Sequence, residues 1–320
     1  MRIFYNKGVR VQDGGKDVVL DPTRRLPDSV VSHGHLDHLS LGALMTVETM
    51  DIMRVRLGRE EGLGVRYGEE VEVNGLTVSL FDAGHVFGSA MIRVEDALYS
   101  GDFNPHGGPT CGTCEPRDCR YLILESTYGK PSLSFPPKED VLSDILNWLE
   151  VSLESGPVVL GAYEFGKAQE LMAVANKLDY PVLVDDRIAD LADVYNRHGH
   201  HLQYSRYREA LEEKSGPYVL ILPTKKLRRP GSPELREALE NGGKSAFASG
   251  WCSIYDLSRS HLLDAQFPLS DHADFSDLLW FVDECNPKVV YTCHGYAQEL
   301  ARKIRSRLRK RAEPLAKGWF

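Results

Sequence analysis

Residues 29–38 read Ser-Val-Val-Ser-His-Gly-His-Leu-Asp-His, a short apolar run followed at once by three histidines and one aspartate. Apolar runs that end at polar residues are typical of buried strands. Neutral imidazoles and carboxylates are preferred ligands of zinc and similar divalent ions. In a tight loop after a strand, His33 and His35 can bind one ion while Asp37 and His38 bind a second. The alternative interpretation is a polar turn that happens to hold histidines.

Three more potential ligands each follow a predicted strand. His85 lies in a glycine-flanked loop after the strand 76–81, and Asp102 and His294 occupy similar places in residues 99–103 and 290–295. Taken singly, such residues are usually a surface histidine or an ordinary turn aspartate. A layered fold gathers the loops that follow its strands into one cleft, so the four features together predict a metal site.

The composition favours a globular protein. The chain has 320 residues, of which 42% are hydrophobic and 26% charged, enough for one large domain or two smaller ones and too apolar for general disorder. No apolar run approaches the roughly 18–20 residues of a transmembrane helix. The N-terminus lacks the apolar stretch of a signal peptide, so we expect a soluble cytoplasmic protein without membrane partners.

The charge balance limits how nucleic acid could be held. Lys and Arg total 38 against 46 Asp and Glu, a formal net charge of −8. This balance argues against a protein that holds nucleic acid by bulk charge alone, but it does not exclude a nucleic-acid enzyme whose site carries its own cations. Six cysteines are too few for a disulfide scaffold. Cys111, Cys114 and Cys119 have the spacing of a zinc knuckle, and buried thiols in a Gly/Pro-rich loop are the alternative.

The pattern of predicted secondary structure changes near residue 137. Before it, short strands and turns are predicted, with Asn74-Gly75 as a hairpin turn. After it, helical and strand patterns alternate, which indicates a parallel α/β unit. Candidate boundaries lie at 134–137 and 258–266.

Four motifs carry a family resemblance. Residues 32–38 resemble the signature of the metallo-β-lactamase superfamily. Residues 124–129, 269–274 and 290–295 resemble motifs A, B and C of its β-CASP nucleases, the group that includes ribonuclease J and Artemis. The resemblance covers nearly the whole chain.

This resemblance implies an α/β fold: a four-layer αββα metallo-β-lactamase core, formed by residues 1–130 and 262–320, with an α/β β-CASP cap inserted at 131–261. Residues 161–170 and 246–251 resemble more narrowly the ligase-associated DNA exonucleases, also called mRNA 3′-end processing factors.

The resemblance also implies a two-metal phosphodiesterase that uses Zn²⁺ or Mn²⁺. One ion would be held by His33, His35 and His85, the other by Asp37, His38 and His294, with Asp102 bridging them. His272 would be the general acid, Glu125 would orient it, and Asp37 is expected to be essential for cleavage with them. Asp21 is expected to support the ligand loop rather than bind metal.

Substrate contacts are predicted from polar and aromatic residues near the motifs. Lys167, at a helix start, and the hydroxyl groups of Ser126, Thr127, Ser249 and Ser270 would bind phosphates, and Trp251 would stack on bases. The alternatives are a solvated lysine and a core aromatic side chain.

The resemblance favours an exonuclease on single-stranded DNA in repair, and family analogy suggests an association with a DNA ligase or helicase. An RNA-processing exo- or endonuclease of the cleavage-and-polyadenylation or ribonuclease J type is the alternative. A small-molecule metallohydrolase and a catalytically silent binding subunit are further alternatives, and the oligomeric state stays open.

Overall fold

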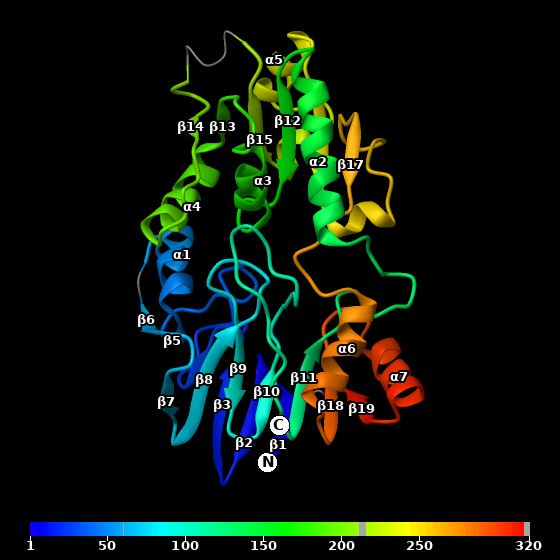
Figure 1. The fold of residues 1–320 in the computed structure, drawn as a ribbon. Helices are drawn as coiled ribbons and strands as arrows, with labels where there is room; N and C mark the ends of the chain where they lie inside the picture. The colour runs from blue at the N-terminus through cyan, green and yellow to red at the C-terminus, as the bar shows by residue number, and fades with distance from the viewer. Residues whose placement is uncertain (60, 211–215, 317–320) are drawn as a thin grey trace. The chain divides into compact units, whose positions relative to one another are not determined.

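The computed structural model describes residues 1–59, 61–210 and 216–316, and the chain divides into two compact units (Figure 1). Unit 1 comprises residues 1–107, 111–134 and the chain from 272 onward. Unit 2 comprises residues 108–110 and 135–271. None of the helices in the described ranges is long and apolar enough to cross a membrane.

Unit 1 contains two sheets. The first has its strands in chain order: β1 (Arg2–Tyr5), β2 (Val9–Asp13), β3 (Lys16–Leu20), β4 (Ser29–Val30), β5 (Ala43–Thr46) and β6 (Gly62–Val65). The second has the order β19-β18-β11-β10-β9-β8-β7. Its strands are β7 (Glu70–Val73), β8 (Leu76–Asp82), β9 (Ala90–Val94), β10 (Ala97–Tyr99), β11 (Tyr121–Glu125), β18 (Val289–Cys293) and β19 (Arg311–Pro314). Asn74 and Gly75, both with positive φ, form the predicted hairpin turn between β7 and β8.

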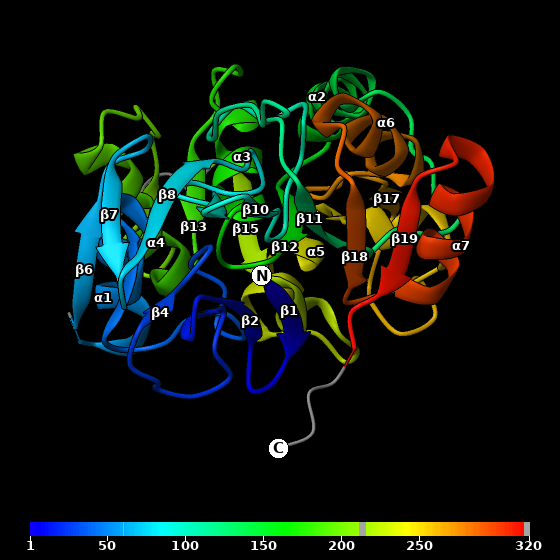
Figure 2. The ribbon, with the colours of Figure 1, turned by 90° about the horizontal axis from the view of Figure 1, so that it is seen from below.

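The two sheets of unit 1 pack face to face and helices cover their outer faces (Figure 2). Alternate residues of β11 show this, because Ile123 joins the core shared by both sheets and Leu122 joins the outer core. That outer core includes α6 (Phe275–Cys285) and α7 (Ala297–Leu308), whereas α1 (Val47–Leu57) covers the first sheet. The predicted αββα layering is confirmed.

Unit 2 is built on one parallel sheet with the strand order β14-β13-β15-β12-β16-β17. Its elements are α2 (Lys138–Leu153), β12 (Val158–Ala162), α3 (Lys167–Ala175), β13 (Val182–Val184), α4 (Asp186–Arg197), β14 (Ser205–Arg206), β15 (Val219–Pro223), η2 (Thr224–Leu227), α5 (Pro233–Glu240), β16 (Lys244–Ala248), η3 (Gly250–Ser253) and β17 (Ala265–Phe267). The predicted α/β alternation is confirmed. Unit 2 ends at Asp271, ten residues beyond the predicted cap boundary at 261.

Candidate metal centre

Strand direction brings the predicted ligands to one edge of the second sheet. Strands β8, β10, β11 and β18 run in the same direction, because β9 is antiparallel to both β8 and β10 and the others pair in parallel. Their carboxyl ends therefore share an edge. His85, Asp102 and His294 follow three of these strands, and Glu125 is the last residue of β11.

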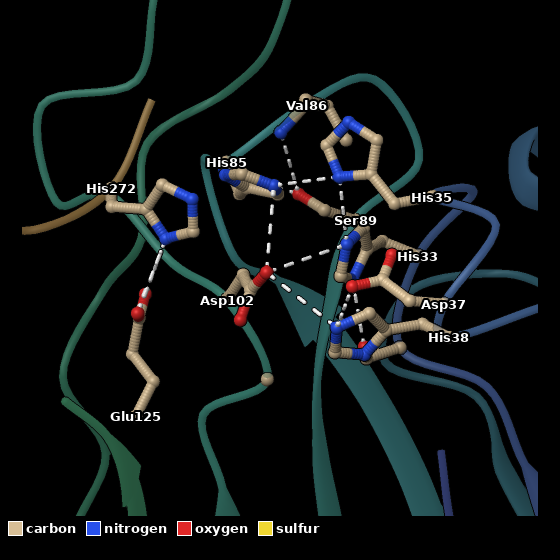
Figure 3. Close-up of polar contacts among 12 residues, drawn as sticks. His33, His35, Asp37, His38, His85, Val86, Ser89, Asp102, Glu125 and His272 are labelled. Atoms are coloured by element: carbon tan, nitrogen blue, oxygen red, sulfur yellow. Dashed lines mark hydrogen bonds and ion pairs between the residues drawn. The ribbon is translucent and has the colours of Figure 1, made fainter. Parts of the chain in front are cut away.

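Four of the predicted ligands converge (Figure 3). One ligand atom each from His33, His35, His85 and Asp102 lies within 4.8 Å of the other three. Nδ1 of His35 is 2.9 Å from Nε2 of His33 and 3.2 Å from Nε2 of His85. Asp102 Oδ2 lies 3.6 Å from Nε2 of His33 and 3.9 Å from that of His85.

The donor chemistry of this cluster fits a divalent ion. Burial, aided by neighbouring histidines, lowers the pKa of His33 well below its usual value. Burial and then the charge of Arg56 lower the pKa of His35 to about 4. Both imidazoles are therefore neutral at pH 7, the form in which histidine binds metal. Neutral nitrogens that face each other beside a carboxylate could hold a divalent ion.

The residues predicted for a second ion are less tightly grouped. Nε2 of His38 lies 3.7 Å from Asp102 Oδ2 and 3.8 Å from Asp37 Oδ2, and the rings of His38 and His294 are 5.9 Å apart. The Asp37 side chain is 83% exposed. Asp37, His38 and His294 are thus less tightly grouped than the first set of ligands, so the second ion stays a prediction.

Asp21 supports the ligand loop, as its sequence position predicts. One carboxylate oxygen accepts hydrogen bonds from the Ser32 amide, and the other from the Ser32 hydroxyl, each 2.7 Å long. The second oxygen also lies 2.8 Å from His38 Nδ1 and accepts from the Tyr99 hydroxyl at 2.9 Å. Sequence reasoning missed Tyr99, which lies in a buried strand and resembles an ordinary core aromatic residue.

Asp21 also sets the protonation of His38. Burial lowers the pKa of His38, but Asp21, followed by Asp102 and Asp37, outweighs burial and raises it to about 10. Because Nδ1 donates to Asp21, Nε2 is the atom that faces Asp102. A cation bound at Nε2 would therefore replace a proton.

The loop that carries His85 is held by hydroxyl groups. Ser89 Oγ accepts hydrogen bonds from the backbone amides of His85 and Val86, and Figure 3 shows it beneath them. At the start of α1, the hydroxyls of Thr46 and Thr49 donate to the Gly88 carbonyl at 2.7 and 2.8 Å. Only the flanking glycines signalled this fixed loop in the sequence.

Glu125 and His272 form a pair beside the metal cluster. Nδ1 of His272 lies 3.1 Å from both carboxylate oxygens of Glu125. Glu125 is fully buried and also accepts the Phe103 amide at 2.9 Å. Burial raises the pKa of Glu125, but His272 and the hydrogen bonds outweigh burial and lower it. Because the His272 ring is 4.5 Å from that of His85, the predicted acid and its partner lie next to the ligands.

The hydroxyl group of Ser126, a predicted substrate contact, forms a hydrogen bond inside the protein. It is fully buried, and its hydroxyl donates to the Cys293 carbonyl at 2.9 Å, which joins β11 to β18. Because this hydroxyl is already bonded inside the sheet, its predicted phosphate contact stays a prediction. Thr127 is half-buried and its hydroxyl bonds to Glu125, and Ser270 is half-buried.

The remaining predicted substrate contacts lie in unit 2. Lys167 is 2% exposed and its ammonium is enclosed by carboxylates, so it is not a solvated lysine ready for phosphate. Ser249 is buried and caps η3 by accepting from the Trp251 amide. Trp251 is half-buried with its ring centroid 6.0 Å from that of Tyr255, so its role in stacking stays a prediction.

The thiols of Cys111 and Cys114 contact other groups in the structure. The Cys111 thiol bonds to the Gly84 carbonyl at 3.3 Å, and the Cys114 sulfur lies 3.3 Å from that of Met91. Burial raises the pKa of the Cys114 thiol. The described ranges contain two possible ligand groups, the one above and a second of Asp102, Glu125 and His272, and neither includes a cysteine. The structure therefore favours buried thiols over a zinc knuckle.

Comparison with known proteins agrees with this arrangement. Residues 265–313 match the family described as "Zn-dependent metallo-hydrolase RNA specificity domain". The chain is 34% identical to a "Probable DNA ligase" of Opitutus terrae over 87% of its own length and 28% of that protein. It is 29% identical to "RNase aCSPSF2" of Saccharolobus solfataricus, over 60% and 47% of the two chains. The chain thus spans less than half the length of either relative.

A third relative is matched over almost its full length. The chain is 33% identical to an "Uncharacterized protein in lig 3'region" of Acidianus ambivalens, over 43% of this chain and 99% of that protein. The αββα core, the ligands at the strand ends and these similarities have one explanation: the chain belongs to the β-CASP group of the metallo-β-lactamase superfamily.

Proposed function

We propose that the protein is a metal-dependent nuclease that acts as an exonuclease on single-stranded DNA. The observation that carries this proposal is the Glu125–His272 pair, which lies beside Asp102 and the clustered histidines. The pair supplies a positioned proton donor, which cleavage of a phosphodiester needs for the leaving oxygen. The ligase and ribonuclease names of two relatives support a nucleic-acid substrate.

The proposed mechanism assigns a role to each group. His33, His35 and His85 would hold one Zn²⁺ or Mn²⁺ ion, Asp37, His38 and His294 the other, and Asp102 would contact both. Bound ions lower the pKa of water and neutralise charge on a phosphate. Glu125 faces Nδ1 of His272, and Nε2 would give its proton to the leaving 3′-oxygen. Glu125 then stays ionised and holds the ring in place.

The relatives support two different polymers as the substrate. The similarity to a probable DNA ligase supports DNA and an association with a ligase. The matched RNA-specificity domain and the ribonuclease relative support RNA as the second candidate.

The test uses end-labelled single-stranded DNA and RNA of one sequence, with Zn²⁺, Mn²⁺ or a chelator. We expect metal-dependent cleavage that is lost in Asp37→Asn and His272→Ala and kept in His201→Ala, an exposed histidine outside the site. The product ladder identifies polymer and direction. Absence of cleavage in wild-type protein shown to bind metal would overturn the proposal in favour of a small-molecule hydrolase or a silent binding subunit.

A further inference from the structure

Lys167 is a buried charge in unit 2. It is the first residue of α3, and its side chain is 2% exposed. Its ammonium nitrogen lies 3.0 Å from Glu170 Oε2 and 2.5 Å from Asp271 Oδ1. A buried ammonium is tolerated only when it is paired in this way, and removing a partner leaves an uncompensated charge.

The pairing continues into a chain of four alternating charges. The other oxygen of Glu170 lies 2.7 Å from Nζ of Lys138, the first residue of α2. Lys138, Glu170 and Asp271 have side chains that are 9%, 4% and 13% exposed. Burial raises the pKa of Asp271, but Lys167 and Lys138 outweigh burial and lower it, so the carboxylate stays charged. The four charges sum to zero. Their ion pairs join α2, α3 and the segment after β17.

Asp271 directly precedes His272 in the sequence. Residues 268–271 belong to neither a helix nor a strand, so no backbone ladder holds them. The ion pair with Lys167 fixes the chain one residue before His272. One residue after it, the Ala273 amide donates to the Phe103 carbonyl at 2.7 Å. Asp271 is thus anchored within unit 2 and Ala273 within unit 1, and His272 is the residue between them in the chain.

We infer that Lys167 is a positioning residue that acts on His272 through Asp271 and does not bind a substrate phosphate. This inference rests on the proposed function of His272. A phosphate could reach the ammonium only by displacing two buried carboxylates. The sequence prediction of a phosphate contact at Lys167 is replaced by this role.

The test separates turnover from binding. Lys167→Met is expected to lower kcat at least tenfold, to leave KM and the Kd for single-stranded DNA in chelator within twofold, and to keep the salt dependence of Kd. Lys167→Arg, which can keep both ion pairs, is expected to restore most of kcat. Lys225→Met is the matched control, since Lys225 is a 62% exposed lysine of the same unit. A weaker Kd with a salt slope reduced by about 0.7 per lost contact, at unchanged kcat, would show a phosphate contact and overturn the inference.

Two further measurements keep the inference testable if turnover fails. Asp271→Asn removes the other end of the pair and replaces Lys167→Met if that variant does not fold. Hydrogen exchange of residues 269–274 is expected to rise in either variant, while β12 and β15 keep their protection. Absence of cleavage by the wild-type protein would count against the proposed function alone. Unchanged hydrogen exchange of residues 269–274 in the variants would count against the positioning role of Lys167 alone.

Discussion

His38 and Asp21 are joined by a hydrogen bond of 2.8 Å between Nδ1 and Oδ2, and this bond decides which nitrogen of His38 faces the centre. Asp21 has a φ of +45°, a left-handed conformation that aims its carboxylate at the ligand loop. The same oxygen accepts from Ser32 and Tyr99. One carboxylate thus contacts a ligand ring, the ligand loop and strand β10 of the second sheet.

Asp21→Asn is expected to weaken metal binding 10- to 100-fold, since a neutral amide orients and polarises the His38 ring less well. Competition titration with a chromophoric chelator measures this affinity. Asp28→Asn is the matched control, because Asp28 is exposed, also has positive φ and lies in the same loop. Equal affinities for the two variants would show that Asp21 does not act on the ligand.

The sequence predicted the ligands because each of them is a local feature. A histidine or aspartate after an apolar strand is visible in a few residues, and parallel strands bring such ends to one edge. Asp21 was predictable for the same reason. The pairing of Glu125 with His272 spans 147 positions, and only the family resemblance connected them in advance.

The partners of Lys167 and Ser126 were not predictable in this way. A lysine at a helix start is normally solvated, and only the fold shows that Asp271, 104 positions away, encloses it. The Ser126 hydroxyl likewise finds its acceptor in Cys293, 167 positions away. Burial depends on such distant contacts, so the sequence alone predicted both residues as substrate contacts.

Glu125→Gln is expected to lower kcat 10²- to 10⁴-fold at unchanged metal content, since a neutral amide cannot stabilise a protonated His272. The amide oxygen of the variant can still accept from the Phe103 amide, so the fold is expected to persist. Steady-state cleavage together with metal analysis measures both quantities. Glu115→Gln, at an 80% exposed carboxylate, controls for loss of charge alone. A fall in metal content equal to the fall in kcat would assign Glu125 to metal binding instead.

Gly88→Ala is expected to displace the loop that carries His85. Gly88 has a φ of +78°, and an added Cβ would lie 2.8 Å from both Glu48 Cβ and the Thr49 amide nitrogen. Gly14→Ala is the matched control, because its φ is +54° and nothing lies within 4 Å of the added atom. Both substitutions carry the backbone penalty of about 1–2 kcal/mol, and only Gly88→Ala is expected to weaken metal binding as well. Denaturant unfolding and metal titration measure the two effects, and equal metal affinities would contradict the prediction.

Unit 2 contains a second ion-pair cluster, away from the metal ligands in sequence. Lys226 Nζ lies 2.7 Å from Glu234 Oε1 and 2.9 Å from Asp185 Oδ2. Burial raises the pKa of Glu234, but the hydrogen bonds from Lys226, the backbone and Ser232 outweigh burial and lower it to about 2. The charged carboxylate is therefore the form that the fold favours.

This depressed pKa predicts acid sensitivity. The stabilisation from Glu234 is present above its unfolded pKa of 4.5 and is lost as the pH falls through that value toward 2. We expect this loss to be about 1 kcal/mol, because water screens the partly exposed pair. Lys226→Met removes the partner and is expected to flatten this part of the curve of unfolding free energy against pH, whereas Lys225→Met keeps it. Since other carboxylates titrate in the same range, the difference between wild type and variant is the quantity to measure. Parallel curves for wild type and Lys226→Met between pH 4.5 and 2 would show that Lys226 does not hold the pKa of Glu234 down.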